Sequence, residues 1–210
     1  MFIGHAALAL AAKPLAPRAH LGVALAATYW LDLVWPIFVL AGIERVEVAP
    51  GITAFTPLDF VHYPWSHSLV AALAWSALFA LGCWKLGRRA ALVMGLLVFS
   101  HWALDALSHR PDLPLWPGSS ALVGLGLWNS VVATLVVESA LFAAGISLYL
   151  RAGGKGTLAF WALIAFFVIA YLGAAFGPPP PGASAVAASA LALWLLPAWG
   201  WWIERRRNPT

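Results

Sequence analysis

Long apolar runs without a single charged side chain constrain this chain more than any other feature of its sequence. Residues 158–176 and 184–203 contain no Lys, Arg, Asp or Glu, and a helix needs about 20 such residues to cross the hydrocarbon core of a bilayer. Only 10% of the 210 residues are charged, whereas soluble domains carry about 25%. The chain has too few charges to cover a globule with hydrated surface, so we expect an integral membrane protein.

The apolar runs predict an all-α, polytopic transmembrane bundle of about six to seven spans. The expected spans are a short or half-inserted segment at 1–12 and longer runs at 20–43, 67–84, 90–108, 128–150, 158–176 and 184–203. Within the second of these runs, Pro36 is expected to kink or end the helix just beyond Asp32. Residues 44–66 form the one sizeable polar connection, and its Pro and Gly residues predict loop or short helix there.

No internal repeat divides the chain, so residues 1–210 are expected to form a single membrane domain. The motifs described below lie in residues 1–120, and residues 121–210 supply the C-terminal helices. The single cysteine, Cys83, excludes an intramolecular disulfide. It lies in an apolar run, where a packing role is the simplest interpretation.

Lys and Arg residues are grouped in alternate connections between the apolar runs. The groups are Lys13 with Arg18, Lys85 with Arg88 and Arg89, Arg151 with Lys155, and residues 205–207. Cytoplasmic loops carry an excess of Lys and Arg, so these connections and the C-terminus are expected in the cytoplasm. Seven crossings then place the N-terminus outside. Because this topology accounts for the net charge of +4, we expect no nucleic-acid partner.

His101, Asp105 and His109 follow one another at intervals of four residues at the end of an apolar run. At about 100° per residue these positions share one helical face. Two imidazoles and a carboxylate form a good ligand set for a divalent metal such as zinc. Ionisable groups near lipid are costly, which favours a functional site over a helix end that simply meets the interface.

The orientation predicted from the basic residues brings most histidines and aspartates to one side of the membrane. His20 is the only histidine expected on the inner side. The residues expected toward the outer side are His5, Asp32, Asp59, His62, His67, His101, Asp105 and His109. This convergence indicates a common site more strongly than any single residue does.

Several short motifs in residues 1–120 resemble those of a known family. They are Gly4-His5, Leu31-Asp32, the string from Trp65 to Leu69 (Trp-Ser-His-Ser-Leu), His101-xxx-Asp105, and Leu-Pro-Leu-Trp-Pro at 113–117. Together they are similar to the YdjM-like family of bacterial inner-membrane proteins described as metal-dependent hydrolases. Two departures are visible: Leu33 and Val34 stand where the family has a second acid and a histidine, and Ser66 replaces threonine. The first departure counts against a fully ligated two-metal site.

The candidate residues can be given roles by the chemistry of a catalytic zinc, which needs three protein ligands and one open position. His67, His101 and Asp105 are the leading ligands, followed by His5 and Asp32. Asp32 and Asp105 could instead act as general base or orient an imidazole. Glu138, an acid in the middle of an apolar run, is a third catalytic candidate or a structural acid. The candidate substrate contacts, each of which could also be a plain loop or surface residue, are His62, His109 and Arg110.

These residues predict a hydrolase that uses a metal-activated water on a lipid or lipid-linked substrate at the extracytoplasmic leaflet of the bacterial inner membrane. Phosphodiester, phosphomonoester, ester and amide bonds all fit such chemistry. A metal-ion or proton transporter is the main alternative, although residues 158–203 hold none of the charged side chains that a pathway would use. A non-catalytic membrane scaffold with a structural metal is the third.

Overall fold

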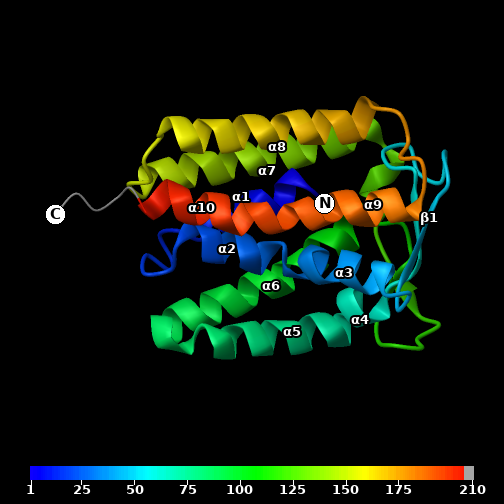
Figure 1. Ribbon diagram of the computed structural model, residues 1–210, viewed down its shortest axis with the longest axis horizontal. Helices are drawn as coiled ribbons and strands as arrows, with labels where there is room; N and C mark the ends of the chain where they lie inside the picture. Colours follow the sequence, from blue (N-terminus) through cyan, green and yellow to red (C-terminus); the bar gives the residue numbers. More distant parts are fainter. Residues whose placement is uncertain (206–210) are drawn as a thin grey trace.

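The computed structural model describes residues 1–205, which form a bundle of helices with two small β-hairpins at one end (Figure 1). The helices are α1 (Ile3–Ala11), α2 (Leu21–Thr28), α3 (Trp30–Leu40), α4 (Pro64–His67), α5 (Leu69–Gly82), α6 (Arg88–Ser108), α7 (Val131–Arg151), α8 (Leu158–Phe176), α9 (Ala183–Ala190) and α10 (Leu195–Arg205), with 3₁₀ turns η1 (Trp84–Leu86), η2 (Leu127–Asn129) and η3 (Leu191–Trp194).

Four helices are long and apolar enough to cross a membrane, namely α6, α7, α8 and the continuous segment Ala183–Glu204 formed by α9, η3 and α10. The pair α2 and α3, bent by 55°, makes a fifth if it is counted as one span. Helices α1 and α5 have 9 and 14 residues, and at about 1.5 Å per residue neither reaches across a core of about 30 Å. The chain is therefore a multi-helix membrane protein, but the predicted six to seven complete spans are not confirmed.

The break between α2 and α3 lies at Thr28 and Tyr29, not at Pro36, which sits inside α3. The Thr28 hydroxyl donates to the carbonyls of Ala24 and Leu25, and such back-bonding bends helices. The prediction that Pro36 ends the helix was wrong. The break has a consequence for the site, because it leaves the Thr28 carbonyl free to accept a bond from outside its own helix.

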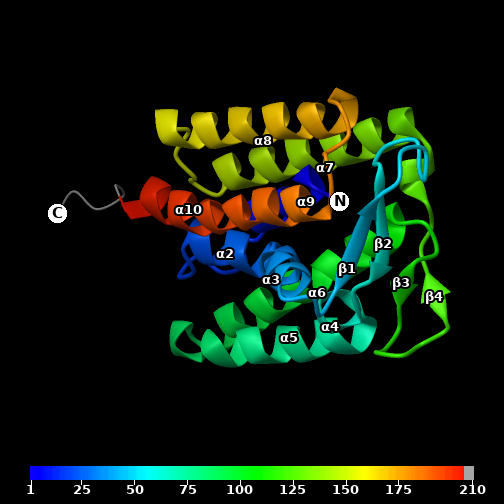
Figure 2. The same cartoon turned by 45° about the vertical axis from the view of Figure 1, so that its right-hand side comes forward.

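The polar connection at 44–66 contains a hairpin where loop or short helix was expected. Strand β1 (Arg45–Val48) pairs antiparallel with β2 (Leu58–His62), with Glu47 opposite Asp59. Strands β3 (Leu113–Pro114) and β4 (Leu122–Val123) form a second small antiparallel pair. Figure 2 shows both hairpins at the same end of the bundle. The all-α prediction is thus correct for the bundle and wrong for these connections.

The basic connections lie at the opposite end from the hairpins. In Figure 1 the links α1–α2, α5–α6 and α7–α8 and the end of α10 all lie at one end of the bundle. Every group of Lys and Arg that was predicted to be cytoplasmic belongs to one of these links or to the chain end; residues 206–207 lie outside the described part. His20 is here too, with Nδ1 3.5 Å from Glu204 Oε2. The expected segregation of basic residues is therefore present, whichever side of the membrane this end occupies.

Helix α1 lies inside the bundle, against α7 and between α2 and α6. Close approach to α7 depends on Gly145, because a Cβ there would lie 2.5 Å from the Ala7 carbonyl oxygen. Small residues allow helix backbones to approach in this way. The interior position of α1 buries His5 to 1% exposure and brings it beside α6.

Candidate metal centre

Five side chains from four helices converge in the bundle interior. They are His5 of α1, Asp32 of α3, His67 of α4, and His101 and Asp105 of α6. These are the five residues that the sequence analysis selected as candidate ligands. Two overlapping groups, His5 with His101 and Asp105, and Asp32 with His67 and His101, have ligand atoms within 4.8 Å of one another, so each could hold a metal ion.

The two imidazoles of His67 and His101 each lie near both aspartates. Nε2 of His101 lies 3.0 Å from Asp105 Oδ2 and 3.7 Å from Asp32 Oδ1. Nε2 of His67 lies 3.8 Å and 3.6 Å from the same two oxygens. Ligands placed 2.0–2.1 Å from a tetrahedral ion are about 3.3 Å apart, so the spacing suits an ion with little rearrangement. The fifth group, His5, has Nε2 3.2 Å from Asp105 Oδ1 and stacks on the His101 ring at 3.7 Å.

The tautomer of His101 follows from its backbone contact. Nδ1 lies 2.7 Å from the Thr28 carbonyl oxygen, and because a carbonyl only accepts, Nδ1 carries the proton. In the neutral imidazole the lone pair is then on Nε2. That atom is buried without a hydrogen-bond partner among residues 1–205, and it faces carboxylate oxygens.

The tautomer of His67 is set by a chain of two hydrogen bonds. The Ser66 hydroxyl donates to Glu44 Oε2 at 2.6 Å, and it lies 2.7 Å from His67 Nδ1. Because the hydroxyl has one proton, it must accept from Nδ1–H, which leaves the Nε2 lone pair facing Asp32 and Asp105. The replacement of threonine by Ser66 keeps the hydroxyl that makes this contact.

Glu44 is a positioning residue that the sequence analysis missed. Its Oε1 accepts from the backbone N–H groups of Trp65 and Ser66, both at 2.8 Å, so it holds the start of α4 as well as the Ser66 hydroxyl. Its exposed fraction is only 3%. No short spacing links Glu44 to the Trp-Ser-His string 22 residues later, and only the β1–β2 hairpin brings them together.

The side chains of Asp105 and Asp32 differ in their exposed fraction. Oδ1 of Asp105 lies 2.5 Å from the Met1 nitrogen, and the side chain is 3% exposed. The Asp32 side chain is 25% exposed, and its Oδ1 lies 3.6 Å from His67 Nε2 and 3.7 Å from His101 Nε2. Asp32 is therefore the carboxylate with room to contact a further molecule.

Glu138, predicted as a catalytic residue, binds the start of α1. Its Oε2 accepts from the backbone N–H groups of Phe2 at 2.9 Å and Gly4 at 3.1 Å. These donors lie at the N-cap and in the first turn of the helix, where they have no partner within the helix. Glu138 therefore positions α1, and with it His5. Its Oε1 is buried without a partner among the described residues.

A cavity of about 400 Å³ adjoins the cluster. Asp32, His67 and Asp105 line its polar part together with Glu138, and His109 is also in its wall. The remaining wall is mainly apolar and comes from α8, α9 and η3 on one side and from residues of the N-terminus, α3, the β1–β2 hairpin and η2 on the other. The cluster therefore lies at one end of a space that a further molecule could enter.

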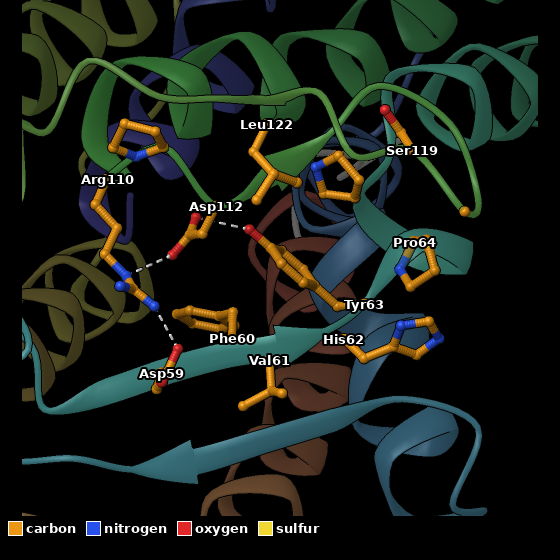
Figure 3. Close-up of a pocket in the computed structure, with 13 residues that line it drawn as sticks. Asp59, Phe60, Val61, His62, Tyr63, Pro64, Arg110, Asp112, Ser119 and Leu122 are labelled. Carbon is orange, nitrogen blue, oxygen red and sulfur yellow. Dashed lines mark hydrogen bonds and ion pairs between the residues drawn. The ribbon is translucent and has the colours of Figure 1, made fainter.

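The other predicted substrate contacts, His62 and Arg110, line a separate hollow of about 530 Å³ between the hairpins (Figure 3). Arg110 donates from Nη2 to Asp59 Oδ1 at 2.5 Å and from Nε to Asp112 Oδ2 at 3.2 Å. Two carboxylates thus offset its charge, which argues against a role in neutralising a phosphate. The structure does not bring His62 or Arg110 to the metal-ligand cluster.

Asp112 was also missed by the sequence analysis. Its Oδ1 lies 2.9 Å from both the Tyr63 hydroxyl and His109 Nδ1. Burial, with the nearby Asp112 carboxylate, raises the pKa of Tyr63 well above its usual value, so Tyr63 donates. A carboxylate only accepts, which places the His109 proton on Nδ1 and leaves Nε2 as the ring atom without a partner among the described residues. The His109 ring packs on Trp128 with centroids 4.3 Å apart.

Comparison with known proteins extends the resemblance seen in the motifs. The family model described as YdjM inner membrane protein matches residues 1–177, which include α1 to α8 and all five clustered residues. No curated protein and no solved structure matches the chain. The match covers well over half of the sequence, and the several apolar helices agree with the family's description. This chain belongs to the YdjM inner membrane protein family.

Proposed function

We propose that this protein is a membrane-embedded, metal-dependent hydrolase, with Asp32, His67 and His101 as the metal ligands and Asp105 and His5 beside them. The proposal depends on one observation: the Nε2 atoms of His67 and His101 lie 3.0–3.8 Å from carboxylate oxygens of Asp32 and Asp105. Nitrogen lone pairs and carboxylates repel one another in a buried site unless a proton or a cation lies between them. A divalent cation held by Asp32, His67 and His101 removes this repulsion and keeps one position open, and zinc suits this ligand set.

A zinc ion in such a site supplies a Lewis acid that makes water nucleophilic near neutral pH. Asp32 is the open carboxylate of the cluster, and its free oxygen can accept a proton from water in the cavity. His109, whose Nδ1 is held by Asp112, can deliver a proton from Nε2 to a leaving group. Glu44, Ser66 and the Thr28 carbonyl keep the two imidazoles in the tautomer that a metal requires.

We place the substrate in the lipid phase. The cavity is surrounded by apolar helices and has a largely apolar wall, which suits an amphiphile better than a water-soluble metabolite. The positive-inside rule puts the basic end of the bundle in the cytoplasm and the hairpin end outside. The cluster would then act on a lipid or lipid-linked substrate from the extracytoplasmic leaflet of the inner membrane.

The proposal is tested with detergent-purified full-length protein, first by elemental analysis and then by turnover. We expect about one zinc or similar ion per chain. Incubation with vesicles of phosphatidylethanolamine and phosphatidylglycerol should release products detectable by mass spectrometry, and a chelator should stop the release until zinc is restored. Protein that takes up no zinc, manganese or iron contradicts the proposal. Bound metal without turnover favours a structural site, and metal uptake into sealed vesicles favours a transporter.

Glu44→Ala is expected to weaken metal binding by about 10–100-fold, the usual effect of removing a group that orients a metal-ligating histidine. Ser66→Ala should do the same, whereas Ser66→Thr should restore affinity because it keeps the hydroxyl. The measurement is competition against a chelating dye. Glu47→Ala is the matched control, since Glu47 is 60% exposed on β1. Unchanged affinity in Glu44→Ala would remove Glu44 from the site.

His109→Gln is expected to slow turnover by about 10²–10⁴-fold, the range for loss of a general acid or base, while metal content stays at the wild-type level. Asp112→Asn should slow turnover less, because His109 keeps its place but loses a charged partner. The control is His20→Gln at the opposite end of the bundle. If His109→Gln loses its metal as well, His109 acts on the cluster itself and does not transfer the proton.

A further inference from the structure

We infer that an acyl chain of a glycerophospholipid enters the cavity sideways from the bilayer, through a mouth between α8 and the α9–η3 segment. The inference rests on the proposed function in one respect: the lipid that enters is taken to be the substrate of the hydrolase. Its physical basis is separate, because it depends on the wall of the cavity and not on the metal.

The mouth is formed by facing surfaces of two apolar segments. On α8, Phe166, Ala170 and Ala174 are spaced four residues apart and so share one helical face. Facing them from α9 and η3 are mostly small residues. These are Val186, Ser189, Ala190, Ala192 and Leu193. Small side chains on both sides leave space between the helices. Figure 1 shows that α8 and α9 both reach the hairpin end of the bundle.

The cavity runs from the outer surface of the bundle to its interior. Ala174, Ser189 and Ala192 at the mouth are exposed. Deeper in the wall, Phe55 and Trp35 are 8% and 5% exposed. Asp32 and His67 lie in the same wall, so the exposed mouth, the buried apolar part and the ligand cluster belong to one continuous space.

Three buried polar atoms in this wall have no hydrogen-bond partner among residues 1–205. They are Nε1 of Trp35, Nε1 of Trp128 and Oε1 of Glu138. Unpaired buried donors are uncommon and call for a partner. An indole N–H can donate to an ester carbonyl or phosphate oxygen, which a lipid carries at the head of its acyl chain. The wall therefore suits an amphiphile with an apolar chain toward the mouth and oxygen atoms toward the cluster.

The surroundings of the mouth favour hydrocarbon as its occupant. Both segments belong to candidate membrane spans, so lipid is what lies outside them. No residue from 158 to 203 is charged, and a charged ligand would find no counter-ion at the mouth. The lining residues of α8 run from its middle, at Phe166, to near its end, at Ala174, and those of α9 follow the 177–182 connection. This places the mouth in the leaflet nearest the hairpins.

The test uses full-length protein in vesicles of phosphatidylethanolamine and phosphatidylglycerol, with a small fraction of phosphatidylcholine carrying a diazirine on one acyl chain. After illumination, labelled residues are located by mass spectrometry. Labelling is expected at Trp35 and Phe55, which are shielded from bulk lipid. In Ala170→Trp this internal labelling should fall by at least about tenfold, since the gap cannot accommodate an indole without strain. Ala165→Trp is the matched control, on an exposed part of α8 outside the cavity wall.

Ala192→Trp, on the opposite wall of the mouth, should give the same loss and keeps the test valid if Ala170→Trp misfolds. Labelling confined to outward-facing residues overturns the inference, and so does internal labelling that neither mouth variant reduces. The experiment requires neither bound metal nor turnover. Absent metal with persistent internal labelling therefore contradicts the hydrolase alone, whereas turnover without internal labelling contradicts the lateral entry alone.

Discussion

Replacing His101 by alanine is expected to remove the bound metal and to lower the metal content from about one ion per chain to a small fraction of that value. His101 belongs to both groups of potential ligands, so no alternative three-residue set remains in the described part of the cluster. Loss of a direct ligand should exceed the roughly 10–100-fold effect of losing an orienting partner, and lipid hydrolysis should disappear with the metal. Elemental analysis and dye competition on detergent-purified protein measure the change.

His101→Gln separates metal loss from misfolding, because its amide can still donate to the Thr28 carbonyl across the α2–α3 break. Both variants should elute from a sizing column like the wild type. His20→Ala, at the basic end of the bundle, is the control for removing a histidine and should keep its metal. A His101→Ala protein that is well folded and fully loaded would show that the cluster is not the metal site.

Glu138→Ala is expected to cause the largest loss of stability. It leaves the N–H groups of Phe2 and Gly4 without the carboxylate oxygen that binds them. At about 1–3 kcal/mol for each unsatisfied buried donor, the cost is about 2–6 kcal/mol, which corresponds to a fall of about 4–24 °C in Tm for a chain of this size. Because α1 carries His5, metal affinity should fall as well. Thermal unfolding in detergent measures the first effect.

Glu138→Gln distinguishes a positioning role from a catalytic one. The carboxamide oxygen can still accept from both N–H groups, so Tm, metal content and turnover should all stay near wild-type values. Loss of turnover at unchanged Tm would instead show that the carboxyl group takes part in proton transfer. Leu172→Ala, at a 45% exposed position on α8, is a control for a truncation that leaves no buried group unpaired.

The membrane class and the candidate ligands were predictable because both depend on local patterns. Hydropathy over about 20 residues identifies a span without any tertiary contact, and His101 and Asp105 are one helical turn apart whatever surrounds them. Span lengths were less predictable, since an apolar run does not show where its helix starts. The run at 67–84 becomes a 14-residue helix because His67 ends α4, Ser68 breaks the helix, and α5 stops at Gly82.

Polar and apolar residues alternate in β1 (Arg-Val-Glu-Val) but not throughout β2 (Leu-Asp-Phe-Val-His), and the Pro and Gly residues nearby favoured a loop. The contact between Glu44 and Ser66 depends on that hairpin, and no spacing in the chain indicates it. Asp112 was not predicted as a site residue, because it lies in a short loop in which Arg110 was the predicted substrate contact. The structure shows Arg110 held by two carboxylates and Asp112 holding His109.

By itself, the sequence determined that this chain is a multi-helix membrane protein, that the groups of Lys and Arg between its apolar runs share one end, and which five side chains could bind a metal. These properties come from residue type and short-range spacing. Only the tertiary structure decided that the five meet, which tautomers His67 and His101 adopt, and where the cavity opens. Those properties depend on contacts between segments far apart in the chain, such as the Thr28 carbonyl with α6 and Gly145 with α1, and residue type alone does not specify such contacts.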